Sequence, residues 1–366
     1  MTNVGSAGGF NRLKEKGLRD GGVGVKLRRE IDILSSWNNP NEKPIVSICC
    51  ISYNHERFIE DALHGFLMQE TEFSFEIVIV DDASTDHTQN IIRNYEKRYP
   101  KIIRAIYQEE NQYSKGLEPA NFYIQHLRGK YVAHCEGDDY WTDRFKLKKQ
   151  VGFLEKNPDY VACYHNVRVV DKEKRELSIS LNNYPYKDEH TVPFQDVEQL
   201  VIPGQTASLL YRNHWLVDEC VEQYLTCKTN GDVKLAAMLG VKGKIFFMSD
   251  VMADHRRVLW EGDSWSARTY GQNLSLHRYN TVESVNDFIF NAYGVKLNNS
   301  DKRYRIVLRA ICYFLKDPNI DNWNIARDLV GKIKGEIINA TLYFVVYPFK
   351  WICRKVLRSL GEGDYE

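Results

Sequence analysis

Apolar runs and amphipathic segments alternate between residues 45 and 135. Residues 45–51 and 75–80 are almost continuously apolar, which is typical of strands buried on both faces. Residues 56–69 between them have apolar side chains at helical spacing. The pattern then predicts a helix ending near residue 99, a strand at 102–107, a helix at about 118–127 and a strand at 131–135. This alternation predicts an α/β fold with a mostly parallel sheet, flanked by helices and joined by right-handed crossovers.

Polar clusters follow three of the predicted strands. They occupy residues 52–55, 81–86 and 136–139. In open α/β sheets, ligands bind beyond the carboxyl ends of the strands. We therefore expect the three clusters to converge into one binding site at one edge of the sheet.

Acidic residues stand where many nucleotide-binding proteins have glycines. The sequence has no GxGxxG after a strand and no GxxxxGK[ST], which argues against nicotinamide-dependent redox chemistry and P-loop phosphoryl transfer. Carboxylates repel phosphate unless a cation lies between them. Glu136, Asp138 and Asp139 therefore indicate a Mg²⁺ or Mn²⁺ ion that bridges the protein to a diphosphate. The alternative interpretation is a solvated acidic turn that caps the next helix.

Three blocks of sequence carry a resemblance to a known family. They are Ile-Ser-Tyr-Asn at 51–54, Val-Asp-Asp-Ala-Ser-Thr-Asp at 80–86 and Glu-Gly-Asp-Asp-Tyr-Trp at 136–141. In order and spacing they resemble glycosyltransferase family 2, and the resemblance covers about residues 44–266. It implies a GT-A (Rossmann-like) fold, a nucleotide-sugar donor that is UDP-linked, a divalent metal ion, and transfer with inversion at the anomeric carbon.

The resemblance also implies roles for individual residues. The nucleotide would be bound by Ile51, Tyr53, Asn54, Asp82 and Asp138. Among these, Asp82 is similar to the acid that binds the uracil ring, and Asp138 is similar to the residue near the ribose. Asp139 matches the metal ligand. Glu136 stands at the first position of the Asp-x-Asp-like motif and, together with Trp141, is expected to contact the sugar or the acceptor.

The second half of the chain is expected to supply the acceptor site and the general base. Asp232 precedes a helix-like run at 233–239, in a segment where the resemblance implies the base. A carboxylate in reach of an acceptor hydroxyl can take its proton as the new bond forms. The alternative is a helix N-cap, which suits an aspartate after a glycine, and the two roles can coexist.

Residues 251–266 resemble the closing loop of the family but depart from its pattern. Either His255 or Trp260 fills the position of the family's histidine. We assign His255 to the metal or the diphosphate, and Arg256 and Arg257 to the diphosphate because of their charge. A loop histidine without a ligand is the alternative. Trp141, Trp260 and Trp265 are candidates for stacking on sugar rings or for core packing, and His134 and His165 are expected in the core.

Composition narrows the classes of function. The formal net charge is +0, which argues against a protein that coats nucleic acid. None of the eight cysteines forms a CxxC pair, so we expect small buried side chains in a reducing compartment and no structural zinc site. There is no recognisable signal peptide and no run of about 20 apolar residues, so we expect a protein on the cytoplasmic side of the membrane.

The carboxyl end has a different pattern. Within 349–360, apolar side chains share one helical face and basic side chains share the other. A basic amphipathic helix of this kind is typical of membrane-surface binding, and packing against the body or a second subunit of a homo-oligomer is the alternative. We therefore place the protein as a peripheral protein on the inner face of the cell membrane.

These features define the expected organisation. Residues 1–43 are interpreted as an extension outside the core, 44–270 as the GT-A domain and 271–366 as a C-terminal helical region. Within the GT-A domain, 44–142 would bind the nucleotide and 143–270 the acceptor, a saccharide that is free or lipid-linked. By resemblance, the product is a bacterial surface glycan such as a capsule or lipopolysaccharide chain. The alternatives are a sugar nucleotidyltransferase and a non-catalytic nucleotide-binding scaffold at a membrane.

Overall fold

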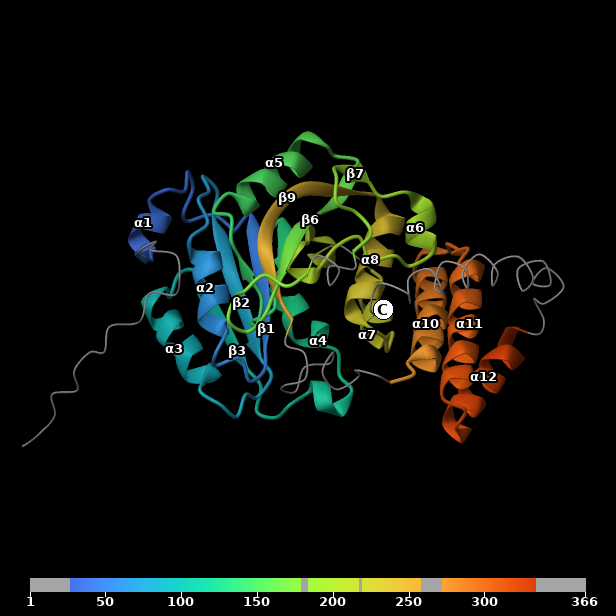
Figure 1. Cartoon of the computed structure of the whole chain (residues 1–366). Coiled ribbons are helices and arrows are strands. Elements are labelled where there is room, and N and C mark those ends of the chain that lie inside the picture. The colour runs from blue at the N-terminus through green and yellow to red at the C-terminus, as the bar shows by residue number, and fades with distance from the viewer. Residues whose placement is uncertain (1–26, 179–183, 217–218, 258–271, 334–366) are drawn as a thin grey trace, which may run out of the picture.

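The structure is a computed structural model that describes residues 27–178, 184–216, 219–257 and 272–333. Its centre is a mixed sheet in which strands follow the order β3-β2-β1-β4-β8-β6-β9-β5, with β7 paired to β9 (Figure 1). Helices cover both faces of this sheet, and the C-terminal helices stand at one side of it (Figure 1).

The first half of the sheet is parallel, as the sequence predicts. Its strands are β1 (Val46–Ser52), β2 (Phe75–Asp81), β3 (Ile103–Tyr107) and β4 (Tyr131–His134). The connecting helices are α2 (Ile59–Leu67), α3 (Thr88–Arg98) and the short α4 (Ala120–Tyr123), which continues as a 3₁₀ turn over Ile124–His126. Ser52 is in register with Asp81, so the polar ends of β1 and β2 lie side by side.

The second half adds antiparallel and irregular pairings. Its strands are β5 (Tyr140–Trp141), β6 (Tyr160–Val170), β7 (His190–Thr191), β8 (Leu210–Arg212) and β9 (Lys244–Arg256). Its helices are α5 (Lys146–Lys156), α6 (Phe194–Glu198), α7 (Val221–Thr226) and α8 (Gly231–Lys242). β8 runs antiparallel to both β4 and β6, whereas β6 and β9 are parallel to each other. Residues 136–139, which we call the acidic motif, directly precede β5. Because β5 pairs antiparallel with β9, this motif lies at the carboxyl end of β9.

The residues before β1 are part of the first core, which corrects one interpretation of the sequence. Helix α1 (Glu30–Leu34) buries Ile33 completely, and Trp37 packs edge-on against Phe75 with 5.2 Å between ring centroids. The Tyr99 hydroxyl donates a hydrogen bond to the carbonyl of Arg28. The interpretation of 1–43 as an extension outside the core was therefore wrong for its described part, because apolar side chains of this segment fill one face of the sheet.

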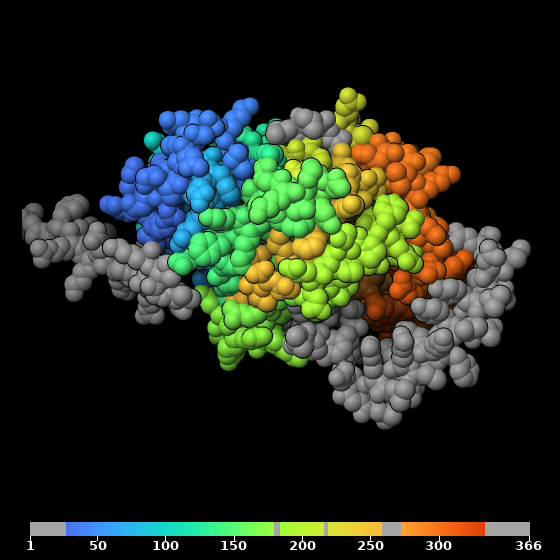
Figure 2. Space-filling model, turned by 90° about the horizontal axis from the view of Figure 1, so that it is seen from above, coloured from blue at the N-terminus to red at the C-terminus, as the bar shows by residue number. Residues whose placement is uncertain are grey.

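The C-terminal region is helical over its described part, as expected. It comprises α10 (Ser275–Tyr293), α11 (Ser300–Lys316) and α12 (Ile320–Ile333). Val282, Val285 and Ile289 of α10 are fully buried in the same apolar cluster as α8 and β6. Seen from above, these helices lie at the end of the molecule opposite the first described residues (Figure 2).

Two further expectations concern the whole chain. No helix within the described ranges is long and apolar enough to cross a membrane. Among the described cysteines, Cys49, Cys50, Cys135, Cys163 and Cys227 are buried, as predicted, whereas Cys220 and Cys312 are partly exposed. The amphipathic segment at 349–360, Cys353, and the tryptophans at 260 and 265 lie outside the described residues.

Candidate active site

The loops after β1 and β2 are bound to each other. Asn54 and Ala83 both adopt positive φ, 55° and 60°, so the chain turns sharply at the end of each strand. The side-chain oxygen of Asn54 accepts a hydrogen bond from the Thr85 backbone, and Ser84 accepts one from the Asn54 backbone. Asn54 therefore shapes the nucleotide loop, and its predicted contact with the nucleotide stays a prediction, as does that of Tyr53.

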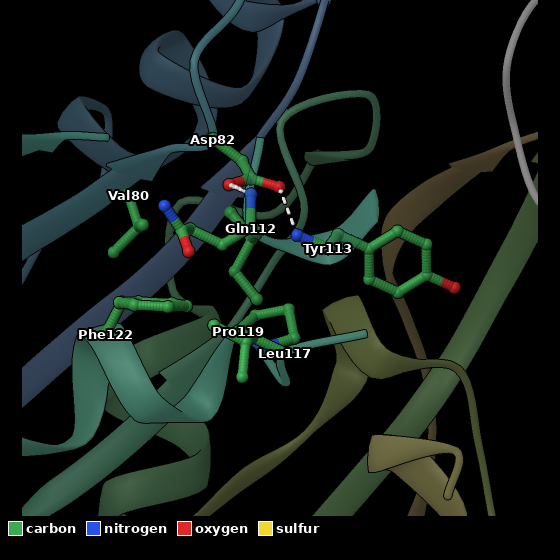
Figure 3. Close-up of a pocket in the computed structure, with 8 residues that line it drawn as sticks. Val80, Asp82, Gln112, Tyr113, Leu117, Pro119 and Phe122 are labelled. Atoms are coloured by element: carbon green, nitrogen blue, oxygen red, sulfur yellow. Dashed lines mark hydrogen bonds between the residues drawn. The ribbon is translucent and has the colours of Figure 1, made fainter. Parts of the chain in front are cut away.

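Asp82 lies at the rim of a small pocket between these loops and α4. Its two carboxylate oxygens accept hydrogen bonds from the backbone of Gln112 at 2.7 Å and of Tyr113 at 3.0 Å (Figure 3). Apolar side chains complete the lining: Ile51, Val80, Leu117, Pro119 and Phe122. Figure 3 shows the Tyr113 ring pointing away from this pocket. The predicted nucleotide residues Ile51 and Asp82 therefore share one pocket with a segment, 112–122, that no motif had indicated.

The acidic motif lies at the end of β4, and its last carboxylate is fully buried. Asp139 accepts hydrogen bonds from the Arg256 backbone at 2.7 Å and from the Gln205 side chain at 2.6 Å. His255 Nδ1 lies 3.1 and 3.2 Å from the two Asp139 oxygens. Asp139 and His255, which the sequence assigns to a metal ion, are thus in direct contact although 116 positions separate them.

Charges of the same sign are concentrated around this contact. The surrounding protein, and then the charges of Asp138 and Asp139, raise the pKa of Glu136 to about 8. Glu136 nevertheless remains accessible, so its carboxyl faces a space that water reaches. Burial is the largest influence and lowers the pKa of His255, but the charge and the hydrogen bond of Asp139, together with the charges of Asp138 and Glu136, outweigh it and raise that pKa.

A divalent cation suits the chemistry of this cluster. It would compensate the negative charge that raises the Glu136 pKa, and an aspartate with a histidine is a ligand pair that Mn²⁺ accepts. No three histidine, cysteine or acidic side chains of the described ranges are arranged to hold a metal ion by themselves. Asp139 and His255 would therefore need further ligands, and the oxygens of a diphosphate are of the right kind.

Asp232 faces the same region from the start of α8. Its side chain is accessible, and its Oδ1 accepts a hydrogen bond from the Val233 backbone at 2.8 Å. The alternative role of Asp232 as the helix N-cap was wrong, because the N-cap of α8 is Asn230 and Asp232 lies within the first turn. The surrounding protein raises the pKa of its carboxyl. Its charge in turn contributes to the raised pKa values of Glu136 and Tyr184. Asp232 is therefore electrostatically coupled to the acidic motif, and Tyr184 is a neighbour that the sequence had not indicated.

Trp141 is not a platform for sugar, and this prediction was wrong. The side chain is 2% exposed, and its indole N–H donates to the carbonyl of Ala207 at 2.9 Å. Its ring packs against Phe66 on one side, and the ammonium of Lys146 lies 4.1 Å from its centroid. The indole is enclosed because β5 runs through the core beside α2. Trp141 is therefore a core residue that supports the acidic motif.

Arg256 is likewise not available to a diphosphate, which corrects a second prediction. The side chain is 4% exposed and pairs with Asp61 of α2 at 2.8 Å. Its guanidinium also donates to the carbonyl of Asp138 and lies against the rings of Phe58 and Tyr140. Arg256 therefore fixes the backbone of the acidic motif.

The remaining predicted residues divide into two groups. Besides burial, the charges of Asp232, Asp139 and Arg257 all act on the pKa of Tyr184. Arg257 therefore lies near these carboxylates and stays a candidate for binding the diphosphate. His134 and His165 are buried core histidines, as predicted. His134 contacts the Tyr211 hydroxyl, and burial lowers its pKa to about 4.

Comparisons with known proteins identify the family of this chain. The family model for Glycosyl transferase family 2 matches residues 47–212. An uncharacterized protein of Mycobacterium tuberculosis (strain ATCC 25618 / H37Rv) is 34% identical over 256 residues, 67% of this chain and 68% of the relative. TuaG of Bacillus subtilis (strain 168), a glycosyltransferase assigned to teichuronic acid biosynthesis, is 40% identical over 114 residues, 31% of this chain and 43% of TuaG.

A solved structure supports the fold. The structure of S. aureus TarS 1–349 in complex with UDP-GlcNAc has a TM-score of 0.52 and 18% identity, over 78% of this chain and 80% of that structure. The architecture is thus that of a GT-A glycosyltransferase. The chain belongs to glycosyl transferase family 2.

Proposed function

We propose that this glycosyltransferase moves a sugar from a UDP-sugar to a hydroxyl of a saccharide acceptor, free or lipid-linked, with inversion at the anomeric carbon. The observation that carries the proposal is an accessible carboxylate, Asp232 at the start of α8, close to the acidic motif at the end of β4. The charge of Asp232 contributes to the raised pKa of Glu136, although the two residues lie on different halves of the fold.

Each group has a chemical task in this reaction. The uracil ring would enter the pocket beside Asp82, where the apolar floor excludes water from one face of the base. Asp232 would take the proton of the acceptor hydroxyl while the hydroxyl oxygen forms a bond to the anomeric carbon. The bond from that carbon to the donor diphosphate breaks on the opposite side, and the nucleoside diphosphate leaves. Because the acceptor oxygen attacks on the side opposite to the leaving diphosphate, the configuration at the anomeric carbon is inverted.

A metal ion has a defined place in the proposal. Asp139 and His255 would hold Mn²⁺ or Mg²⁺ together with diphosphate oxygens, and Arg257 would lie near the same group. The ion would supply positive charge to the departing diphosphate.

The two alternative functions each lack support. A sugar nucleotidyltransferase would need a glycine-rich basic loop after the first strand, but this chain has Ser52-Tyr53-Asn54-His55. A non-catalytic scaffold would need no base, but Asp232 is accessible and has a raised pKa. Family membership also favours transfer.

A donor panel tests the proposal directly. UDP- and GDP-sugars are added to the protein with Mn²⁺ or with a chelator, and the melting temperature is measured. A ligand at about 100 times its Kd should stabilise the protein by about 2.7 kcal/mol, and only in the presence of the metal. If neither UDP nor any nucleotide-sugar produces a shift with metal, the proposed nucleotide site is wrong. If only a GDP-sugar produces a shift, the site stands and only the predicted nucleobase, uracil, is wrong.

The acceptor and the place of action form a finer proposal. We place the reaction in the synthesis of a bacterial surface polysaccharide, at the inner face of the cell membrane, with the basic segment at 349–360 on the lipid surface. The assignment of TuaG to teichuronic acid biosynthesis supports this choice. Removal of 336–366 should abolish sedimentation with anionic lipid vesicles, which full-length protein should show. Equal sedimentation of both proteins would contradict the membrane role.

A further inference from the structure

A fully buried ammonium lies at the start of the helix that carries Asp232. Lys234 is 0% exposed, and its Nζ donates to the carbonyls of Tyr224 at 3.0 Å and of Cys227 at 2.8 Å. Both carbonyls belong to the end of α7, just before the turn into α8. An unpaired buried charge costs several kcal/mol, so such a group persists only where its partners are fixed. Lys234 therefore ties the first turn of α8 to the end of α7.

The third partner of Lys234 comes from the nucleotide half of the fold. Glu118 Oε2 lies 3.4 Å from the Lys234 Nζ, and the Glu118 side chain is 19% exposed. A Cβ atom at Gly231 would stand 3.5 Å from the same carboxylate oxygen, so Glu118 lies directly against the start of α8. The charge of Asp232 also contributes to the raised pKa of Glu118, which burial causes in the first place.

The chain around Glu118 reaches the donor pocket. Its two neighbours, Leu117 and Pro119, line the pocket beside Asp82. Glu118 points the other way, toward α8. One short segment thus contacts the nucleotide pocket on one side and the helix of the candidate base on the other.

We propose that the buried Glu118–Lys234 pair positions Asp232 for proton transfer and links its placement to the loop that binds the donor nucleoside. Lys234 and Glu118 are positioning residues in this proposal, because neither has to touch the acceptor. The inference rests on the proposed function, since it needs Asp232 to act as the base. A base displaced by about 1 Å can lower the rate about a hundredfold, so a small shift of α8 is sufficient.

The first test removes the ammonium. Lys234→Met keeps a side chain of similar length and should lower kcat at least about tenfold while the donor Kd changes less than about threefold. Asn213→Leu is the matched control, because Asn213 is also buried and its amide donates to two carbonyls, those of Leu127 and Gly129, just before β4 begins and away from the site. Both variants should melt at lower temperature, but only Lys234→Met should lose turnover. Equal kcat in Lys234→Met and the wild type would overturn the proposal.

The second test separates positioning from general loss of structure. If Lys234 acts through Asp232, then adding Lys234→Met to Asp232→Asn should change the residual kcat less than about twofold. A further tenfold loss in the double variant would overturn the positioning role. Glu118→Gln, which keeps an oxygen to accept from Lys234, should be milder than Glu118→Ala. Equal, near-normal kcat in both Glu118 variants would exclude the link to the donor loop.

These results also distinguish failure of the inference from failure of the proposed function. If Asp232→Asn retains normal transfer, the assignment of the base is wrong. If Asp232→Asn abolishes transfer and Lys234→Met does not, the base stands and the positioning pair is refuted.

Discussion

Asp232→Asn is expected to lower kcat by about 10²–10⁴-fold, because an amide cannot accept the proton of the acceptor hydroxyl. The donor Kd should change less than about threefold, since Asp232 lies on the acceptor side and its loss affects the reaction step. The asparagine oxygen can still accept the hydrogen bond from Val233, so the start of α8 should be kept. Steady-state rates and a donor titration by calorimetry measure both quantities.

The matched control is a carboxylate in the same helical position elsewhere. Asp321 lies in the first turn of α12 and is exposed, so Asp321→Asn should leave kcat unchanged. Near-normal turnover by Asp232→Asn would show that the base is another group.

The pH dependence of wild-type kcat checks the same assignment. The surrounding protein raises the pKa of Asp232. Its carboxylate therefore takes up a proton at a higher pH than an ordinary aspartate, whose pKa is about 3.9. A protonated carboxyl cannot act as a base, so the rate should fall as the pH drops through this raised pKa and be full above it. Asp232→Asn should remove this acid limb, and an unchanged limb would assign it to another group.

Asp139→Asn should have the second large effect, a loss of transfer of about 10³-fold or more, in line with the loss of a group that stabilises the departing charge. The substitution also removes a buried charge that accepts hydrogen bonds from Arg256 and Gln205, so the free energy of unfolding should fall by about 1–3 kcal/mol. Urea unfolding and steady-state rates measure these changes.

A readout at His255 separates this prediction from simple destabilisation. The charge of Asp139 raises the His255 pKa, so that pKa should fall in Asp139→Asn, as followed by NMR of the histidine ring. Glu76→Gln is the matched control, because Glu76 is also buried, at 3% exposed, but bonds to Arg128 at the start of β2, away from the site. This variant should lose stability and keep kcat. An active Asp139→Asn enzyme with an unchanged His255 pKa would refute the assigned role.

The parallel half of the sheet and the position of the polar clusters at the ends of its strands were predictable from sequence. Strands such as 75–80 are recognisable because a strand buried on both faces has to be apolar throughout. The acidic clusters at 81–86 and 136–139 could be placed at one edge because parallel strands end on the same side. The exact helix at 118–127 was less predictable, since it breaks into a short α-helix and a 3₁₀ turn.

The roles of single side chains depended on partners that are remote in sequence. Arg256 looked like a diphosphate ligand because of its charge, but Asp61, 195 positions away, holds it in the interior. Trp141 was a candidate for stacking on a sugar ring, but its strand, β5, packs against α2, and Phe66 of that helix contacts the indole. Gln205 and Glu118 have no motif around them, and only their contacts with Asp139 and Lys234 indicate a role.

The sequence by itself determined the order of strands and helices between residues 45 and 135, the carboxylates at the ends of those strands and the family to which they belong. These features depend on periodicity and on short local spacings, which are properties of neighbouring residues. Only the tertiary structure decided which charges are buried in ion pairs and which face the site. Burial and pairing depend on residues that are distant along the chain, and the same arginine or tryptophan has a different role when folding encloses it.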